Sequence, residues 1–131
     1  MTTNPVHTDG NAVPPLDDTL TGLLEDLAGI HPGIDLLRDG IRLIALDRLT
    51  TDQTQTLAAT LAGSSDGTDV ITAIAHLIAR LTNPHTNPSL RTLPFTQQKE
   101  TQHHGEQALF ALTDDWLHQH ASEASAAISS Y

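Results

Sequence analysis

The sequence predicts an all-helical protein, a compact bundle of about four to six helices with a flexible N-terminus and a proline-rich crossing before a long C-terminal helix. Three observations lead to this fold class. Large apolar side chains recur three and four residues apart in successive segments, which is the period of an α-helix. The segment 69–81 is apolar over much of its circumference and needs neighbours on more than one side. Strict alternation of apolar and polar residues, which would predict strands, is scarce.

The length of 131 residues predicts one domain with loose ends. Residues 1–15 contain Asn, Asp, Gly and Pro with few large apolar groups, so this segment is expected to be flexible. A single helical domain is expected over residues 16–124. The last residues, 125–131, are expected to fray.

The first two helices are predicted from their caps and apolar stripes. The first is expected over 17–28, with an aspartate accepting hydrogen bonds from the first-turn amides. Gly29 permits the backbone conformation that ends a helix. The second is expected over 32–49, and it carries a second apolar face with Leu36 and Leu43. That face needs either another helix of the chain or a partner.

The next two helices follow closely. Thr50 and Gln53 match a capping box, in which each side chain bonds the amide of the other residue. Asp66 or Thr68 is expected to cap the central helix over 69–83. The helices are expected to pair as two hairpins in series, the first with the second and the third with the fourth. The predicted centre of the core consists of Leu37, Ile41, Ile44, Ile71, Ile74, Leu77 and Ile78.

The proline-rich segment 83–98 lacks a helical period and is expected to be an extended connection inside the domain. A last helix is expected over 99–124. Its buried side carries Leu109, Leu112 and Trp116, and Phe110 lies at the edge of that side.

The composition is acidic, with 16 Asp and Glu against 6 Lys and Arg, a formal charge of −10. Nucleic-acid backbones and anionic membranes attract clustered Lys and Arg, so neither is an expected partner. The charge favours either a basic protein partner or simply a well-solvated surface.

The absence of cysteine excludes a thiolate nucleophile and a cysteine-based zinc site. The N-terminal stretch has neither the basic nor the apolar part of a secretory signal, and no run of about 18 apolar residues occurs. A cytoplasmic location is therefore expected.

The last predicted helix holds most of the possible metal ligands. Asp114 and His118 share a helical face, as do Glu100 and His104. The two pairs lie about 21 Å apart along one helix and cannot share an ion. We therefore expect no metal and no cofactor, and His104, His118 and Asp114 are the residues that come closest to forming a metal site.

Motifs for catalysis are missing: the sequence has no GxSxG, no HExxH and no glycine-rich phosphate loop. His76, beside Thr72 and Arg80 on the central helix, is the one candidate for a general base, and a small helical enzyme with a His76-centred acid/base pocket is the alternative function. A helix-turn-helix is rejected, because the segment that would enter the major groove is apolar.

The predicted function is a non-catalytic, acidic, protein-binding domain that acts as an accessory or regulatory partner. It rests on apolar faces in excess of what a small bundle can cover. The residues expected to bind a protein partner, or a second copy in a homodimer, are Leu36, Leu43 and Phe110.

Overall fold

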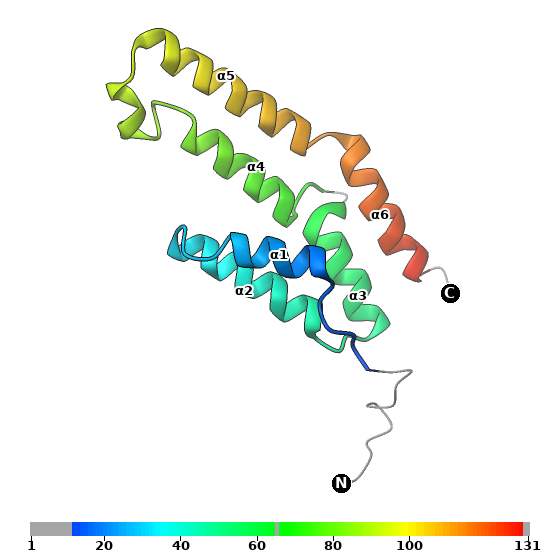
Figure 1. Ribbon diagram of the computed structural model, residues 1–131. Helices are drawn as coiled ribbons and strands as arrows, with labels where there is room; N and C mark the ends of the chain where they lie inside the picture. Colours follow the sequence, from blue (N-terminus) through cyan, green and yellow to red (C-terminus); the bar gives the residue numbers. More distant parts are fainter. Residues whose placement is uncertain (1–11, 65, 130–131) are drawn as a thin grey trace. The chain divides into compact units, whose positions relative to one another are not determined.

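A computed structural model describes residues 12–64 and 66–129, and in these ranges every regular element is helical (Figure 1). The all-helical class is therefore confirmed. The chain forms two compact units, residues 1–49 and 50–131, and each is described by itself. The expectation of one domain over 16–124 stays a prediction. Most of the segment 1–15, expected to be flexible, lies outside the described residues.

The first unit contains α1 (Asp18–Asp26) and α2 (Pro32–Leu46). The Asp17 side chain caps α1 by accepting a hydrogen bond from the Leu20 amide at 2.7 Å. Gly29 has a φ of +81° in the turn between the helices, a conformation that glycine adopts without a steric penalty. The caps and the first hairpin were predicted correctly, although α2 ends three residues earlier than expected.

Two polar contacts join the helices of this unit. The Arg38 Nε donates to the Leu24 carbonyl at 2.6 Å, and the Gly29 amide donates to the Asp35 carboxylate at 2.9 Å. Leu24 is the one large side chain that is fully buried in the described ranges, with 1% of its surface exposed. The unit is thus a helical hairpin in which side chains from one side of α2, Arg38 and Asp35, bond to α1 and to the turn.

In residues 50–64 and 66–129, which the structure describes, the second unit contains four α-helices and two short helical segments. The α-helices are α3 (Thr51–Ala58), α4 (Val70–Leu81), α5 (Phe95–Leu112) and α6 (Asp115–Ser129). A π-helical segment, Ala59–Gly63, continues α3, and a 3₁₀ helix, Pro88–Thr92, lies in the proline-rich connection. The predicted capping box is present, with Thr50 N to Gln53 Oε1 at 2.9 Å and Gln53 N to Thr50 Oγ1 at 3.1 Å.

The pairing of helices in this unit differs from the prediction. α4 packs along α5, whereas α3 and its π-helical extension pack along α6 (Figure 1). The expected hairpin of the third and fourth helices is therefore wrong. The cap of α4 is Asp69, whose carboxylate accepts from the Thr72 amide at 2.9 Å, rather than Asp66 or Thr68.

The predicted final helix over 99–124 is helical but divided. α5 begins earlier, at Phe95, and ends at Leu112; α6 starts after Asp114 and runs to Ser129. The Thr113 hydroxyl donates to the Leu109 carbonyl at 2.7 Å, and the Asp114 carbonyl accepts hydrogen bonds from the Leu117 and His118 amides. Residues 125–129, expected to fray, thus continue α6, and 130–131 lie outside the described residues.

Close contacts between helices in the second unit are made by small residues. Gly63, Ala75, Gly105 and Ser125 are buried, and the Ser125 hydroxyl donates to the Gln55 carbonyl at 3.0 Å. A Cβ on Gly63 would lie 2.6 Å from the Ser122 amide nitrogen. Glycine is therefore required where the π-helical segment meets α6.

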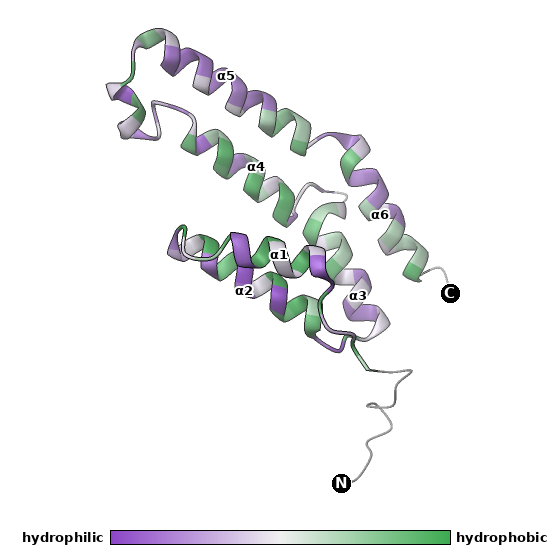
Figure 2. Cartoon of the chain, viewed as in Figure 1, coloured by the Kyte–Doolittle hydropathy of each residue, from purple (hydrophilic) through white to green (hydrophobic). Residues whose placement is uncertain are grey.

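The predicted core needs correction. Leu77, Leu37 and Ile41 are exposed rather than central, and the other four residues of that set are half-buried. Small side chains make the close helix contacts, and Leu37, Ile41 and Leu77 keep much of their surface exposed. Figure 2 shows this apolar character along much of α4.

Candidate functional site

The outer face of α2 is the clearest unpartnered apolar surface of the first unit. Leu36 has 74% of its surface exposed and Leu43 has 72%. The two residues are seven positions apart, so they lie on one side of the helix about 10 Å apart along its axis. We call the side of the helix formed by Leu36 and Leu43 the α2 face.

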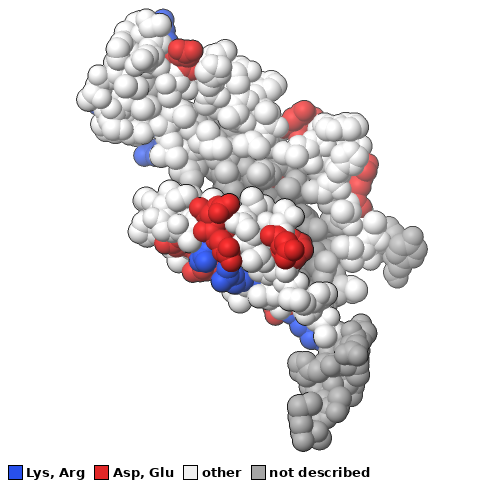
Figure 3. All heavy atoms as spheres, viewed as in Figure 1, with Lys and Arg blue, Asp and Glu red and all other residues white. Residues whose placement is uncertain are grey.

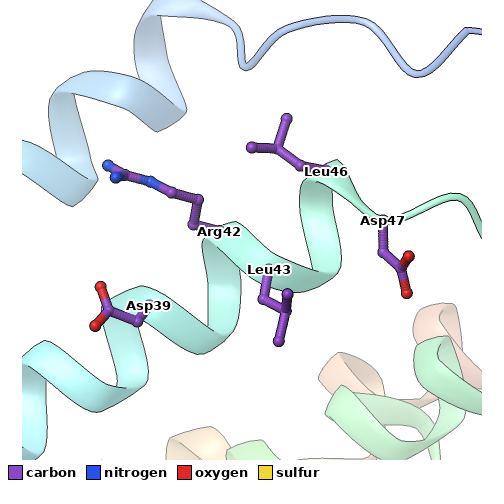
Figure 4. A pocket seen from close by; sticks show the side chains of 5 residues that line it. All are labelled: Asp39, Arg42, Leu43, Leu46 and Asp47. Atoms are coloured by element: carbon purple, nitrogen blue, oxygen red, sulfur yellow. The ribbon is translucent and has the colours of Figure 1, made fainter.

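A pocket of about 440 Å³ adjoins the α2 face and is lined by Asp39, Arg42, Leu43, Leu46 and Asp47. Figure 4 shows that Arg42 and Leu46 project from one side of α2 and that Leu43 projects from the other. Asp39 lies 3.2 Å from the Arg38 guanidinium, and Asp47 accepts a hydrogen bond from the Arg48 amide. The pocket thus combines apolar side chains with two carboxylates and one guanidinium.

Phe110, the third residue predicted to bind a partner, belongs to the second unit and lies near the end of α5. Its ring is 80% exposed. With Thr113, Asp114 and Asp115 it lines a shallow pocket of about 220 Å³. The structure leaves all three predicted partner-binding side chains uncovered, and their role in binding stays a prediction.

Carboxylates are spread over the α1–α2 hairpin beside a smaller basic cluster, as Figure 3 shows. The pocket beside Leu43 is itself mixed in sign, with Asp39, Asp47 and Arg42, within a chain whose formal charge is −10.

His76 does not lie in a catalytic arrangement. It is exposed on α4, and its ring has no hydrogen-bond partner among the described residues. The pockets at α2 and at the end of α5 are lined by other residues. The alternative function, a small helical enzyme with a His76-centred acid/base pocket, stays a prediction.

The metal candidates are also separated by the fold. The His104 ring contacts the His103 ring edge-on, with centroids 5.5 Å apart, and Asp114 lies at the turn into α6. In the ranges that the structure describes, no group of three or more His, Asp and Glu side chains could hold a metal ion. Both ring nitrogens of His118 are engaged in hydrogen bonds, so neither is free to ligate a metal.

The sequence did not predict the buried pair Asp69–His118, which the structure shows. His118 Nδ1 lies 2.9 Å from an Asp69 carboxylate oxygen, and Nε2 lies 2.9 Å from the Leu112 carbonyl oxygen. The Asp69 side chain has no exposed surface, and that of His118 is 14% exposed. Because both neighbouring oxygens are hydrogen-bond acceptors, this geometry favours the imidazole with a proton on each ring nitrogen.

The pKa values of the pair shift in the directions that this geometry requires. The hydrogen bond to the Leu112 carbonyl, together with the charge of Asp69, raises the pKa of His118 above its ordinary value despite the burial. Burial acts to raise the pKa of Asp69, but hydrogen bonds from Thr72 and the charge of His118 outweigh it and hold that pKa below its ordinary value. The pair joins the start of α4 to α6, 49 residues further along the chain.

The hydrogen bonds of the pair link α4 to α6 within the second unit. Both ring nitrogens of His118 and the Asp69 carboxylate take part in hydrogen bonds. The described residues contain no buried side-chain polar atom without a hydrogen-bond partner. A general base needs a lone pair directed at a substrate, and His118 offers none in this state.

No family model, curated protein or solved structure matches this chain. No helix of the described ranges is both long enough and apolar enough to cross a membrane.

Proposed function

We propose that this protein is a non-catalytic accessory or regulatory domain that binds a basic protein segment on the α2 face and acts in the cytoplasm. The observation that carries the proposal is the exposure of Leu36 and Leu43, 74% and 72%, on one side of one helix. Fully burying a leucine side chain stabilises a complex by about 1.5–3 kcal/mol. Two such anchors on a rigid helix fit the helix-in-groove and helix-on-helix modes of recognition.

The chemistry of the partner follows from the charges around these anchors. Asp39 and Asp47 line the pocket beside Leu43, and the whole chain carries −10. A partner helix with apolar side chains flanked by Lys or Arg would cover the leucines and pair with these carboxylates. Long-range attraction would speed its association, and added salt would slow it.

The test compares three forms of the full chain as bait in the native host. Wild type is compared with a Leu36→Glu, Leu43→Glu variant and with a Gln97→Glu, Gln107→Glu control that adds the same charge at exposed positions of α5. The partner retrieved is then titrated against each form in solution. Burying a carboxylate in place of each leucine is expected to weaken binding by at least about 100-fold, because an unpaired charge would be desolvated.

Circular dichroism verifies that the variants remain helical, as is expected for exposed positions. Loss of a basic partner from the α2 variant alone supports the proposal. Equal retention of that partner by all three forms contradicts it. A wild-type chain that forms a dimer by light scattering, dissociated by the α2 substitutions, would assign the face to a second copy and overturn the basic-segment proposal.

A further inference from the structure

A cavity in the second unit has the opposite electrostatic character from the pockets described above. Its volume is about 440 Å³, and its walls include Pro84, His85, Arg91, Phe95 and Lys99. They come from the turn after α4, the 3₁₀ helix and the first two turns of α5. The volume falls within the range of about 300–1,000 Å³ that small-molecule sites occupy.

The lining of this cavity is basic in an acidic chain. It holds Arg91 and Lys99, two of the 6 basic residues, together with His85, whereas none of its described lining residues is a carboxylate. A carboxylate lies nearby on α5: Gln102 at the edge of the cavity donates to Glu106 at 3.2 Å. The positive charge of the cavity therefore comes from Arg91 on the 3₁₀ helix and Lys99 on α5.

Arg91 is held in place by the backbone of the turn. Its Nε donates to the Pro84 carbonyl at 2.8 Å, and its Nη2 donates to the His85 carbonyl at 3.1 Å. Both acceptors are neutral, so the guanidinium keeps its full charge, and its remaining N–H groups have no acceptor in the described ranges. A fixed guanidinium loses little side-chain entropy when it binds an oxyanion.

Lys99 faces the ring of Phe95, with its Nζ 4.9 Å from the ring centroid. That cation–π contact leaves the N–H donors of the ammonium without an oxygen acceptor among the residues described. The first amides of α5 also lack a side-chain cap, since Pro94 stands at the cap position. The positive end of this helix therefore adds to the potential of the cavity.

From this geometry we infer that the cavity binds a small organic anion, whose oxyanion group pairs with Arg91 and Lys99 and whose apolar part lies against Phe95 and Pro84. This site is separate from the α2 face and goes beyond the proposed function. Either a phosphate ester or a carboxylate supplies the required chemistry. The repulsion from distant carboxylates is largely screened at physiological salt, where the Debye length is about 8 Å.

The experiment is an NMR titration of the ¹⁵N-labelled full chain at constant ionic strength. The probes are phenyl phosphate, benzoate and, as the neutral control, benzyl alcohol. Saturable shifts confined to residues 84–102 are expected with at least one anion, with a dissociation constant below about 5 mM. The anion that binds more tightly identifies the oxyanion group. Benzyl alcohol is expected to cause no saturable shift.

Matched variants locate the binding charge. Lys99→Gln is expected to weaken the better anion about 5–10-fold, the range for one charge-assisted hydrogen bond. Arg48→Gln, which removes the same charge at an exposed position after α2, is expected to change the affinity less than about twofold. Absence of saturable shifts with both anions would overturn the inference, as would equal losses in the two variants or binding of benzyl alcohol as tight as that of the anions.

Discussion

Removal of His118 tests the buried interaction that joins the start of α4 to α6. In His118→Ala, the Asp69 carboxylate loses its charged partner, and the Leu112 carbonyl loses its donor. Asp69 has no exposed side-chain surface, so water cannot replace the lost partner without a rearrangement.

The expected loss follows from burial. Breaking a fully buried ion pair costs about 3–5 kcal/mol, because an uncompensated charge remains inside. His118 is 14% exposed, and water can enter the space that it leaves. We therefore expect a loss of about 2–3 kcal/mol for His118→Ala. Asp69→Asn should cost less, about 1–2 kcal/mol, because asparagine also caps a helix N-terminus well.

The contribution of the pair depends on pH in a defined direction. The pKa of His118 is raised in the folded state, so its stabilisation is fully present below the ordinary histidine value of 6.5 and is lost as pH rises through the raised pKa. The pKa of Asp69 is lowered, so its stabilisation is present above 3.8 and is lost as pH falls through the folded value. The difference between wild type and His118→Ala should therefore be largest between these two limits.

The groups that face the imidazole are the Asp69 carboxylate of α4, the Leu112 carbonyl at the end of α5 and the Ala62 carbonyl of the π-helical segment. Asp114 and Asp115 lie at the start of its own helix. Of these facing groups, only the Asp69 carboxylate carries a charge that raises the pKa of His118. Asp69→Asn should therefore bring that pKa closer to its ordinary value and flatten the decline in stability above pH 6.5.

The assay is urea unfolding followed by far-ultraviolet circular dichroism at several pH values. His120→Ala is the matched control, since this exposed histidine lies 3.8 Å from an exposed Glu123 and should change stability by less than about 0.5 kcal/mol. A His118→Ala loss below about 1 kcal/mol, or an Asp69→Asn protein with the wild-type pH dependence, would refute the reasoning.

The remaining predictions concern packing, and unfolding free energies measure all of them. Gly63→Ala should destabilise the protein by about 1–3 kcal/mol, because the added Cβ would meet the Ser122 backbone. Gly40→Ala, whose Cβ would lie in open space, should stabilise the protein by up to about 1 kcal/mol. Equal effects of the two substitutions would contradict the packing described. Leu24→Ala should cost about 2–5 kcal/mol, and Leu36→Ala less than about 0.5 kcal/mol. A reversal of the two leucine values would show that the α2 face is part of the core.

Local features of the fold could be predicted because they depend on neighbours in sequence. Asp17, the Thr50–Gln53 box and Gly29 each act within a few residues, and the structure confirms them. The division of the last helix was missed, since residues 112–115, where the helix divides, contain neither Pro nor Gly. A signal was nonetheless present, because Asp114 precedes an apolar periodic run, as an N-cap does.

Tertiary features could not be predicted in the same way. Asp69 and His118 are 49 residues apart, and sequence spacing within α6 associates His118 with Asp114 instead. The apolar pattern of α4 indicates a helix that packs against other helices. It does not show whether large side chains fill the interface or whether the helices approach closely at small buried residues such as Ala75 and Gly105. The exposure of Leu36 and Leu43 agrees with the excess of apolar faces noted in the sequence.

Hydroxyl-radical labelling of Leu36 and Leu43 tests the central claim most directly. The side chains should be labelled readily in the purified chain and protected when the same chain is bound in an extract of its native host, while exposed Leu81 of α4 serves as the reference. Equal labelling of the α2 leucines in the pure chain and in the extract would contradict the account.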